Sequence, residues 1–191
     1  MQIIDASDRQ PDAFGYSLYC LVLLVPEPVA SDVQGVRDLL RPERVMIPAH
    51  VTILGTFCEV ESLEFVYERI SGAMAGTDAL NLVPTGDIFK SPNRLTAGAV
   101  IEVSPDMRAL HDQLAEAILP TAINAYMDPA NFMAHLTYYQ QLSESEKKRG
   151  GRITREFELS AFDVSGVTLM GRVGTSSEGE WRVVQEFPFV G

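Results

Sequence analysis

The sequence predicts an α+β fold in a chain of 191 residues, built from two halves with the same order of elements. Apolar residues recur with the period of a strand in some segments and with that of a helix in others. The order of these segments then repeats once along the chain. The composition, 46% apolar and 21% charged residues, is typical of a globular protein that folds alone.

The first half contains two strands and two helices in alternation. We expect a strand over 16–25, a helix over 31–40, a strand over 50–57 and a helix over 62–74. Pro26 ends the first strand, and Ser31 is a suitable N-cap for the helix that follows. The apolar face of this helix is predicted to hold Val33, Val36, Leu39 and Leu40.

The second half begins at a turn. The sequence "KSPN" at 90–93 joins a strand over 80–89 to one over 94–103, and Pro105 opens a helix over 105–118. Later elements are a strand over 131–139, a short helix near 143–149, and strands over 157–172 and 181–189. We expect the whole chain to form one domain. Its two halves, residues 16–90 and 91–191, are predicted to be related by a pseudo-twofold axis.

Charge and apolar patterning exclude several function classes. Fifteen Lys and Arg against 26 Asp and Glu give a formal charge of −11, which repels long duplex nucleic acids but allows a small phosphate ligand. The longest apolar run, 16–25, has half of the roughly 20 residues that a bilayer requires, and acidic residues precede it. We therefore expect no membrane span and no secretory signal. Cys20 and Cys58 lie in apolar stretches, which favours free thiols and a cytoplasmic location.

Two short segments share one pattern: His50-Val51-Thr52-Ile53 and His135-Leu136-Thr137-Tyr138. Both fall at the same place in the repeated order of elements. Side chains two apart on a strand point to the same face, so each segment exposes a histidine and a threonine on one face. Two apolar residues then face the other way in each segment. The doubling is unlikely to be chance and predicts one shared site.

Such a site suits phosphodiester chemistry. Of two imidazoles that titrate near neutral pH, one can accept a proton while the other, protonated, donates one. Thr52 and Thr137 can donate hydrogen bonds to phosphate oxygens. The pattern does not say whether His50 or His135 is the base. It requires no metal or other cofactor, and no metal-ligand spacing accompanies either segment.

The paired motifs resemble those of the two-histidine (2H) phosphoesterase superfamily, in the branch of the 2′-5′ RNA ligases and cyclic nucleotide phosphodiesterases. The repeated halves and the closing "EWRVVQEFPF" fit the same resemblance. It implies a bilobal fold of two ferredoxin-like halves with antiparallel sheets around a central cleft. It also implies metal-free cleavage of 2′,3′-cyclic phosphates or related 2′-linked esters, with His50 and His135 as acid and base and with Thr52 and Thr137 holding the phosphate.

One departure bears on the substrate. Ligase-type relatives often carry a basic residue soon after the second motif, where this chain has Gln140 and Gln141. With the acidic charge, this favours a small nucleotide or compact cyclic ester over an RNA end. RNA end-joining in the 2′-5′ sense stays an alternative, as does a module that binds a phosphate metabolite without turnover. We expect a monomer.

Structural interpretations compete with the functional ones. His50 and His135 could be hydrogen-bonded structural residues, and the two threonines could simply favour a strand. His111, in the middle of a predicted helix, is expected to be a partly exposed surface residue. Three further residues are candidate substrate contacts that could equally be surface residues: Tyr139, Lys90 and Arg94.

Overall fold

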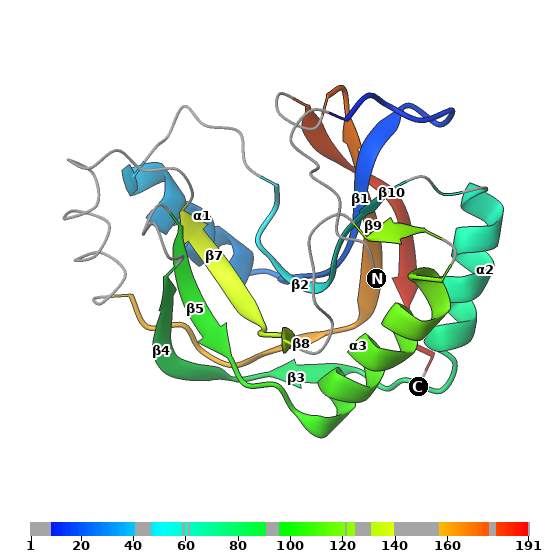
Figure 1. Cartoon of the computed structure of the whole chain (residues 1–191). Coiled ribbons are helices and arrows are strands. Elements are labelled where there is room, and N and C mark those ends of the chain that lie inside the picture. The colour runs from blue at the N-terminus through cyan, green and yellow to red at the C-terminus, as the bar shows by residue number, and fades with distance from the viewer. Residues whose placement is uncertain are drawn as a thin grey trace.

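The computed structural model describes residues 9–40, 47–58, 60, 62–90, 96–120, 122–124, 131–139, 157–175 and 179–190. Within these ranges the chain forms three helices and ten strands (Figure 1). The helices are α1 (Val29–Leu40), α2 (Leu63–Ala73) and α3 (Pro105–Ile118). The strands are β1 (Tyr16–Leu24), β2 (His50–Cys58), β3 (Leu80–Leu82), β4 (Pro84–Lys90), β5 (Ala97–Ile101), β6 (Ile123–Asn124), β7 (His135–Tyr139), β8 (Phe162–Val164), β9 (Gly166–Val173) and β10 (Glu180–Pro188).

Eight of these strands form one sheet, in the order β10-β9-β1-β2-β7-β5-β4, with β6 paired to β2. The remaining two, β3 and β8, pair with each other. Every pairing between these strands is antiparallel. The predicted α+β class is therefore confirmed.

The strands of the two predicted halves are interleaved in space. β9 pairs with β1 and β10 with β9, although β9 and β10 close the chain. β4, from the end of the first half, pairs with β5 of the second. The strands that carry the two histidine motifs, β2 and β7, lie side by side in the middle of the sheet. The duplication itself remains a prediction.

Two predicted strands are each divided. The strand expected over 80–89 is β3 followed by β4, and that expected over 157–172 is reduced to β8 and β9. The physical reason is the second sheet, because β3 and β8 leave the large sheet to pair with each other. The strand predicted over 131–139 is shorter, starting at His135. The predicted turn at 90–93 and helix near 143–149 fall largely or wholly outside the described residues.

Helix α1 differs from its prediction at its start and in its buried face. It begins at Val29, so Ser31 lies in the first turn and donates its hydroxyl to Glu27 instead of capping the helix. Leu39 is 54% exposed, whereas Arg37 is 3% exposed. Prediction by hydrophobicity alone thus assigned one leucine to the wrong face and overlooked a buried arginine.

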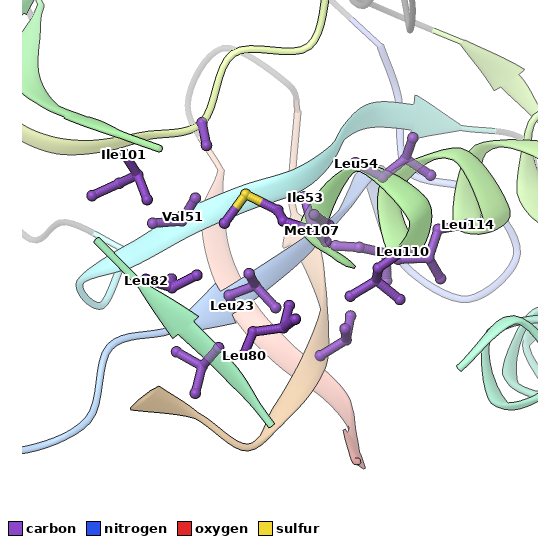
Figure 2. Packing of buried hydrophobic residues seen from close by; sticks show 14 of the residues in the cluster. Leu23, Val51, Ile53, Leu54, Leu80, Leu82, Ile101, Met107, Leu110 and Leu114 are labelled. Carbon is purple, nitrogen blue, oxygen red and sulfur yellow. The ribbon is translucent and has the colours of Figure 1, made fainter. Parts of the chain in front are cut away.

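Helices α2 and α3 start at serine caps and pack against each other (Figure 1). The Ser62 hydroxyl accepts from the backbone N–H of Phe65, and that of Ser104 from Met107. Figure 2 shows side chains of α3, Met107 and Leu110 among them, packed over β2 and β1. Burying each such side chain stabilises the fold by about 1.5–3 kcal/mol.

Both cysteines lie in the interior. Cys20 and Cys58 are both buried, and no disulfide joins them. Burial raises the pKa of the Cys20 thiol, which keeps it protonated and unreactive. None of the helices in the described part of the chain combines the length and apolar character needed to cross a bilayer.

Candidate functional site

The two histidine motifs lie on adjacent antiparallel strands. Val51 of β2 is the partner of Leu136 of β7. Residues on either side of an antiparallel pair face one another in reverse order, so this register places His50 opposite Thr137 and Thr52 opposite His135. Directly opposite side chains share a face. The two histidines and two threonines therefore form a diagonal arrangement on one face of the sheet.

The opposite face of both strands is core. Val51, Ile53, Leu136 and Tyr138 are at most 1% exposed. On the motif face, His50, Thr52 and His135 are partly accessible, and Thr137 is buried. The alternation predicted from the sequence is thus present in both motifs. It leaves two imidazoles on the face that a ligand can reach.

Both histidine rings are held in the same way. Nδ1 of His50 lies 2.7 Å from the carbonyl oxygen of Pro48, and Nδ1 of His135 lies 3.2 Å from that of Met133. A carbonyl only accepts hydrogen bonds, so each Nδ1 carries a proton. Each neutral ring then keeps the lone pair of Nε2 for a ligand or a proton. The contact spans two residues in each case, although the accepting residues, Pro48 and Met133, are of different types.

The electrostatic environment keeps both rings neutral. Burial is the main cause that lowers the pKa of His50 from its ordinary value of 6.5 to about 4. The hydrogen bond to Pro48 opposes this effect, and the positive charges of Arg37 and of protonated His135 add to it. The pKa of His135 is also lowered, mainly by burial. At pH 7 both imidazoles are therefore neutral.

The strands that flank the motifs also hold them in matching ways. The backbone N–H of Val25, just after β1, donates to the carbonyl of Ala49, and that of Ile101 in β5 donates to Ala134. Each acceptor is the residue immediately before a motif histidine. These paired contacts are what a duplication would produce, and they fix both histidines at the start of their strands.

A sequence model of the 2′-5′ RNA ligase superfamily matches residues 25–176, which include both motifs. The chain belongs to this superfamily. The resemblance to two-histidine phosphoesterases inferred from the motifs is thereby confirmed. No curated protein matches the chain in sequence at a significant level.

Solved structures share the fold of the superfamily at low sequence identity. TT0787 of Thermus thermophilus is 14% identical with a TM-score of 0.63, covering 90% of this chain and 97% of its own. Escherichia coli LigT complexed with phosphate is 11% identical with a TM-score of 0.59, covering 97% and 99%. LigT complexed with 3′-AMP is 12% identical with the same TM-score and coverage. At these identities the likeness establishes the fold.

The other candidate contacts, Lys90, Tyr139 and Arg94, are described only in part. Lys90 is exposed at the end of β4, and within the described part of the chain no contact joins it to the motif residues. Tyr139 closes β7 by pairing with Ala97, but its side chain lies outside the described residues. Arg94 lies outside them as well, as do Gln140 and Gln141. These candidates stay predictions.

His111 was predicted wrongly. It is fully buried, with Nδ1 2.7 Å from the carbonyl oxygen of Ile53 and its ring stacked on Phe132 at 4.1 Å between centroids. It occupies the apolar face of α3, four residues after Met107 and three before Leu114. That spacing is the signal that could have revealed its burial.

Phe89 and Arg37 were missed by the sequence interpretation. The Phe89 ring, in β4, lies 4.3 Å from the His135 ring between centroids and limits its rotation. Arg37 donates to backbone carbonyls beside both motifs. Phe89 offered no signal, because its contact depends on the pairing of strands distant in sequence. Among the described residues, no cluster of three or more His, Cys, Asp or Glu side chains could hold a metal ion.

Proposed function

We propose that this chain is a phosphoesterase that opens a 2′,3′-cyclic phosphate, or cleaves a related 2′-linked phosphodiester, of a small nucleotide. Membership of the superfamily supports a phosphoesterase or related activity. The observation that carries the finer proposal is the diagonal arrangement of His50, Thr52, His135 and Thr137. It offers two proton-transfer groups and two hydroxyl donors to a single phosphate.

His50 is the better candidate for the base. Its pKa is lowered to about 4, so it stays unprotonated over most of the pH range. Nε2 of His50 takes a proton from water as the water oxygen bonds to phosphorus. The bond between phosphorus and one ribose oxygen then breaks, and Nε2 of His135 gives its proton to that departing oxygen. The cycle is reset when His50 releases its proton to water and His135 regains a proton from water, so no direct proton transfer from His50 to His135 is needed.

His135 is suited to be the acid once an anion is bound. Burial is the main cause that lowers the pKa of both histidines, and the charge of Arg37 lowers the pKa of His50 further. A phosphate anion nearby favours the protonated imidazole and so raises the pKa of His135 in the complex. The hydroxyls of Thr52 and Thr137 can donate to the two non-bridging phosphate oxygens, where charge develops during attack.

The proposed substrate class has two supports. LigT, which shares this fold, has been crystallised with phosphate and with 3′-AMP. The formal charge of −11 opposes long polyanions but not a small ester. Both favour a nucleotide with a single reacting phosphate as the ligand.

Hydrolysis of the four 2′,3′-cyclic nucleotides in EDTA tests the proposal. We expect turnover by the wild type and a loss of about 10²–10⁴-fold in kcat for His50→Ala and for His135→Ala. The double variant should lose little more than either single variant, because the two act in one step. Full activity in either single variant would overturn the mechanism. Tight binding without turnover by the wild type would overturn catalysis in favour of a binding module.

A further inference from the structure

Arg37 is a buried cation without a carboxylate partner among the described residues. It lies on α1, which packs against β7 (Figure 1), and is 3% exposed. Its Nη1 donates to the carbonyl of Ile47 at 2.9 Å and its Nη2 to that of Thr137 at 3.0 Å. Its Nε is buried and has no hydrogen-bond partner within the described part of the chain. An uncompensated buried charge is costly, so it calls for an explanation.

One acceptor carbonyl lies just before the first motif, and the other lies within the second. Ile47 lies three residues before His50, and Thr137 is itself a motif residue. One guanidinium therefore joins the approach to the first motif to the strand of the second. In the described structure, the backbone pairing between β2 and β7 consists of one partner pair, Val51 and Leu136. The two hydrogen bonds of Arg37 provide a second connection between the β2 and β7 segments.

Helix α3 makes the corresponding contacts for the other motif with two residues instead of one. Arg108 donates to the carbonyl of Phe132, three residues before His135, at 3.2 Å. His111 contacts the carbonyl of Ile53, on the opposite motif strand. Arg108 is only partly buried, whereas Arg37 is 3% exposed. Of these two arginines, only Arg37, on α1, is therefore buried. The two histidines thus have matched support but unequal surroundings.

We propose that Arg37 is a positioning residue of the reaction: it aligns the two motif strands and places a buried positive charge on the His50 side of the histidine pair. This inference rests on the proposed function. The two proposed effects of Arg37, strand alignment and charge, require different properties of its side chain. Alignment needs a planar group that reaches two carbonyls, whereas the charge effect needs only a cation.

The charge has a defined target. Burial lowers the pKa of Arg37 to about 10, so it remains protonated at neutral pH. Of the described groups, those whose charge acts on His50 are Arg37 from α1 and His135 from β7, while β1 places Leu24 opposite it. Removing the charge of Arg37 should therefore raise the pKa of His50 and make it a base over a narrower pH range.

Two substitutions separate these effects. Arg37→Met keeps a long side chain but removes the charge and both hydrogen bonds, and Arg37→Lys keeps the charge while losing the planar pair of donors. Arg172→Met is the matched control, because Arg172 in β9 also has a buried Nε without a partner in the described structure. Arg172 pairs with Leu18, whereas His50 pairs with Leu24 at the other end of β1.

The readouts are the NMR titration of the His50 ring in the unliganded protein, assigned by His50→Asn, and the pH dependence of kcat and kcat/KM for a 2′,3′-cyclic nucleotide. For Arg37→Met we expect the His50 midpoint to rise by about half a pH unit or more and kcat to fall about tenfold or more. Arg37→Lys should keep the midpoint near that of the wild type while lowering kcat. Arg172→Met should change neither quantity.

The titration keeps the inference separate from the proposed function, because it needs no turnover. A folded Arg37→Met with an unchanged His50 midpoint and unchanged kcat overturns the role of Arg37 and leaves the proposed function standing. An inactive wild type overturns the proposed function, whatever the titration gives. If Arg37→Met fails to fold, Arg37→Lys decides: wild-type kcat in that variant would overturn the alignment role.

Discussion

Val51 of β2 and Leu136 of β7 are antiparallel partners, and this single pair brings together two motifs separated by 85 residues. Because both side chains point into the core, the neighbours on either side point to the accessible face. The pair thereby sets His50 against Thr137 and Thr52 against His135. A shift of one residue in this register would bury the motif residues and expose the apolar ones.

The pH dependence of kcat/KM should have its maximum on the acid side of neutrality. It should rise as His50 loses its proton near pH 4, and fall as His135 loses its proton at a pKa below 6.5. In the complex the substrate phosphate favours protonated His135, so the falling limb of kcat should lie at higher pH than that of kcat/KM. Steady-state kinetics between about pH 3.5 and 9, with circular dichroism at each pH, measures both. Coincident falling limbs would contradict the assignment of His135 as the acid.

Replacing either motif threonine by valine should reduce the rate without unfolding the chain. Valine matches the shape of threonine but lacks the hydroxyl, so Thr52→Val and Thr137→Val should each lower kcat about 10²-fold with little change in KM. Thr168→Val in β9 is the matched control, since Thr168 is buried like Thr137 and lies two strands from β2. An equal loss of kcat in the control would mean that the effect is structural.

The motif residues could be predicted from the sequence because their chemistry follows from a local period. Alternation along a strand places His50 with Thr52, and His135 with Thr137, whatever the rest of the chain does. That the two strands are neighbours does not follow from this, because pairing between distant segments depends on tertiary packing. The same limit explains why the strand predicted over 80–89 proved to be two, with β3 in a separate sheet.

The burial of Arg37 and His111 could not be predicted from hydrophobicity, and the reason is the same for both. Arg37 follows Val33 by four residues, and His111 follows Met107 by four, so both lie within the buried faces of their helices. A polar residue is normally assigned to the solvent side even at such a position. Here each one is buried because a carbonyl of a motif strand is within reach of its ring or guanidinium.

Gly98 should be essential for the spacing between β5 and β7. It is the sheet partner of Thr137, and a Cβ atom there would overlap the carbonyl oxygen of Leu136 and crowd the Cα of Thr137. Gly98→Ala must therefore push β7 away, and we expect a loss of about 1–3 kcal/mol in the free energy of unfolding together with a lower kcat. Urea denaturation and the cyclic nucleotide assay measure the two effects.

Gly72→Ala provides the control for this change. Gly72 lies in α2, and apart from its chain neighbours and the backbone of its own helix, no described atom lies within 4 Å of a Cβ built there. Alanine should be neutral or stabilise the helix by up to about 1 kcal/mol. Gly98→Ala with the stability and kcat of the wild type would show that β5 and β7 can separate without disturbing Thr137.

His111 should contribute to stability through its hydrogen bond to the motif strand. His111→Phe keeps a ring that can stack on Phe132 but leaves the buried carbonyl of Ile53 without this donor. An unsatisfied buried carbonyl costs about 1–3 kcal/mol, so the free energy of unfolding should fall by that amount. Asp112→Asn is the control: its carboxylate lies 3.9 Å from Nε2 of His111 but is 60% exposed, and its loss should cost less than about 1 kcal/mol. Equal losses in the two variants would assign the effect to the contact between His111 and Asp112 instead of the link between α3 and β2.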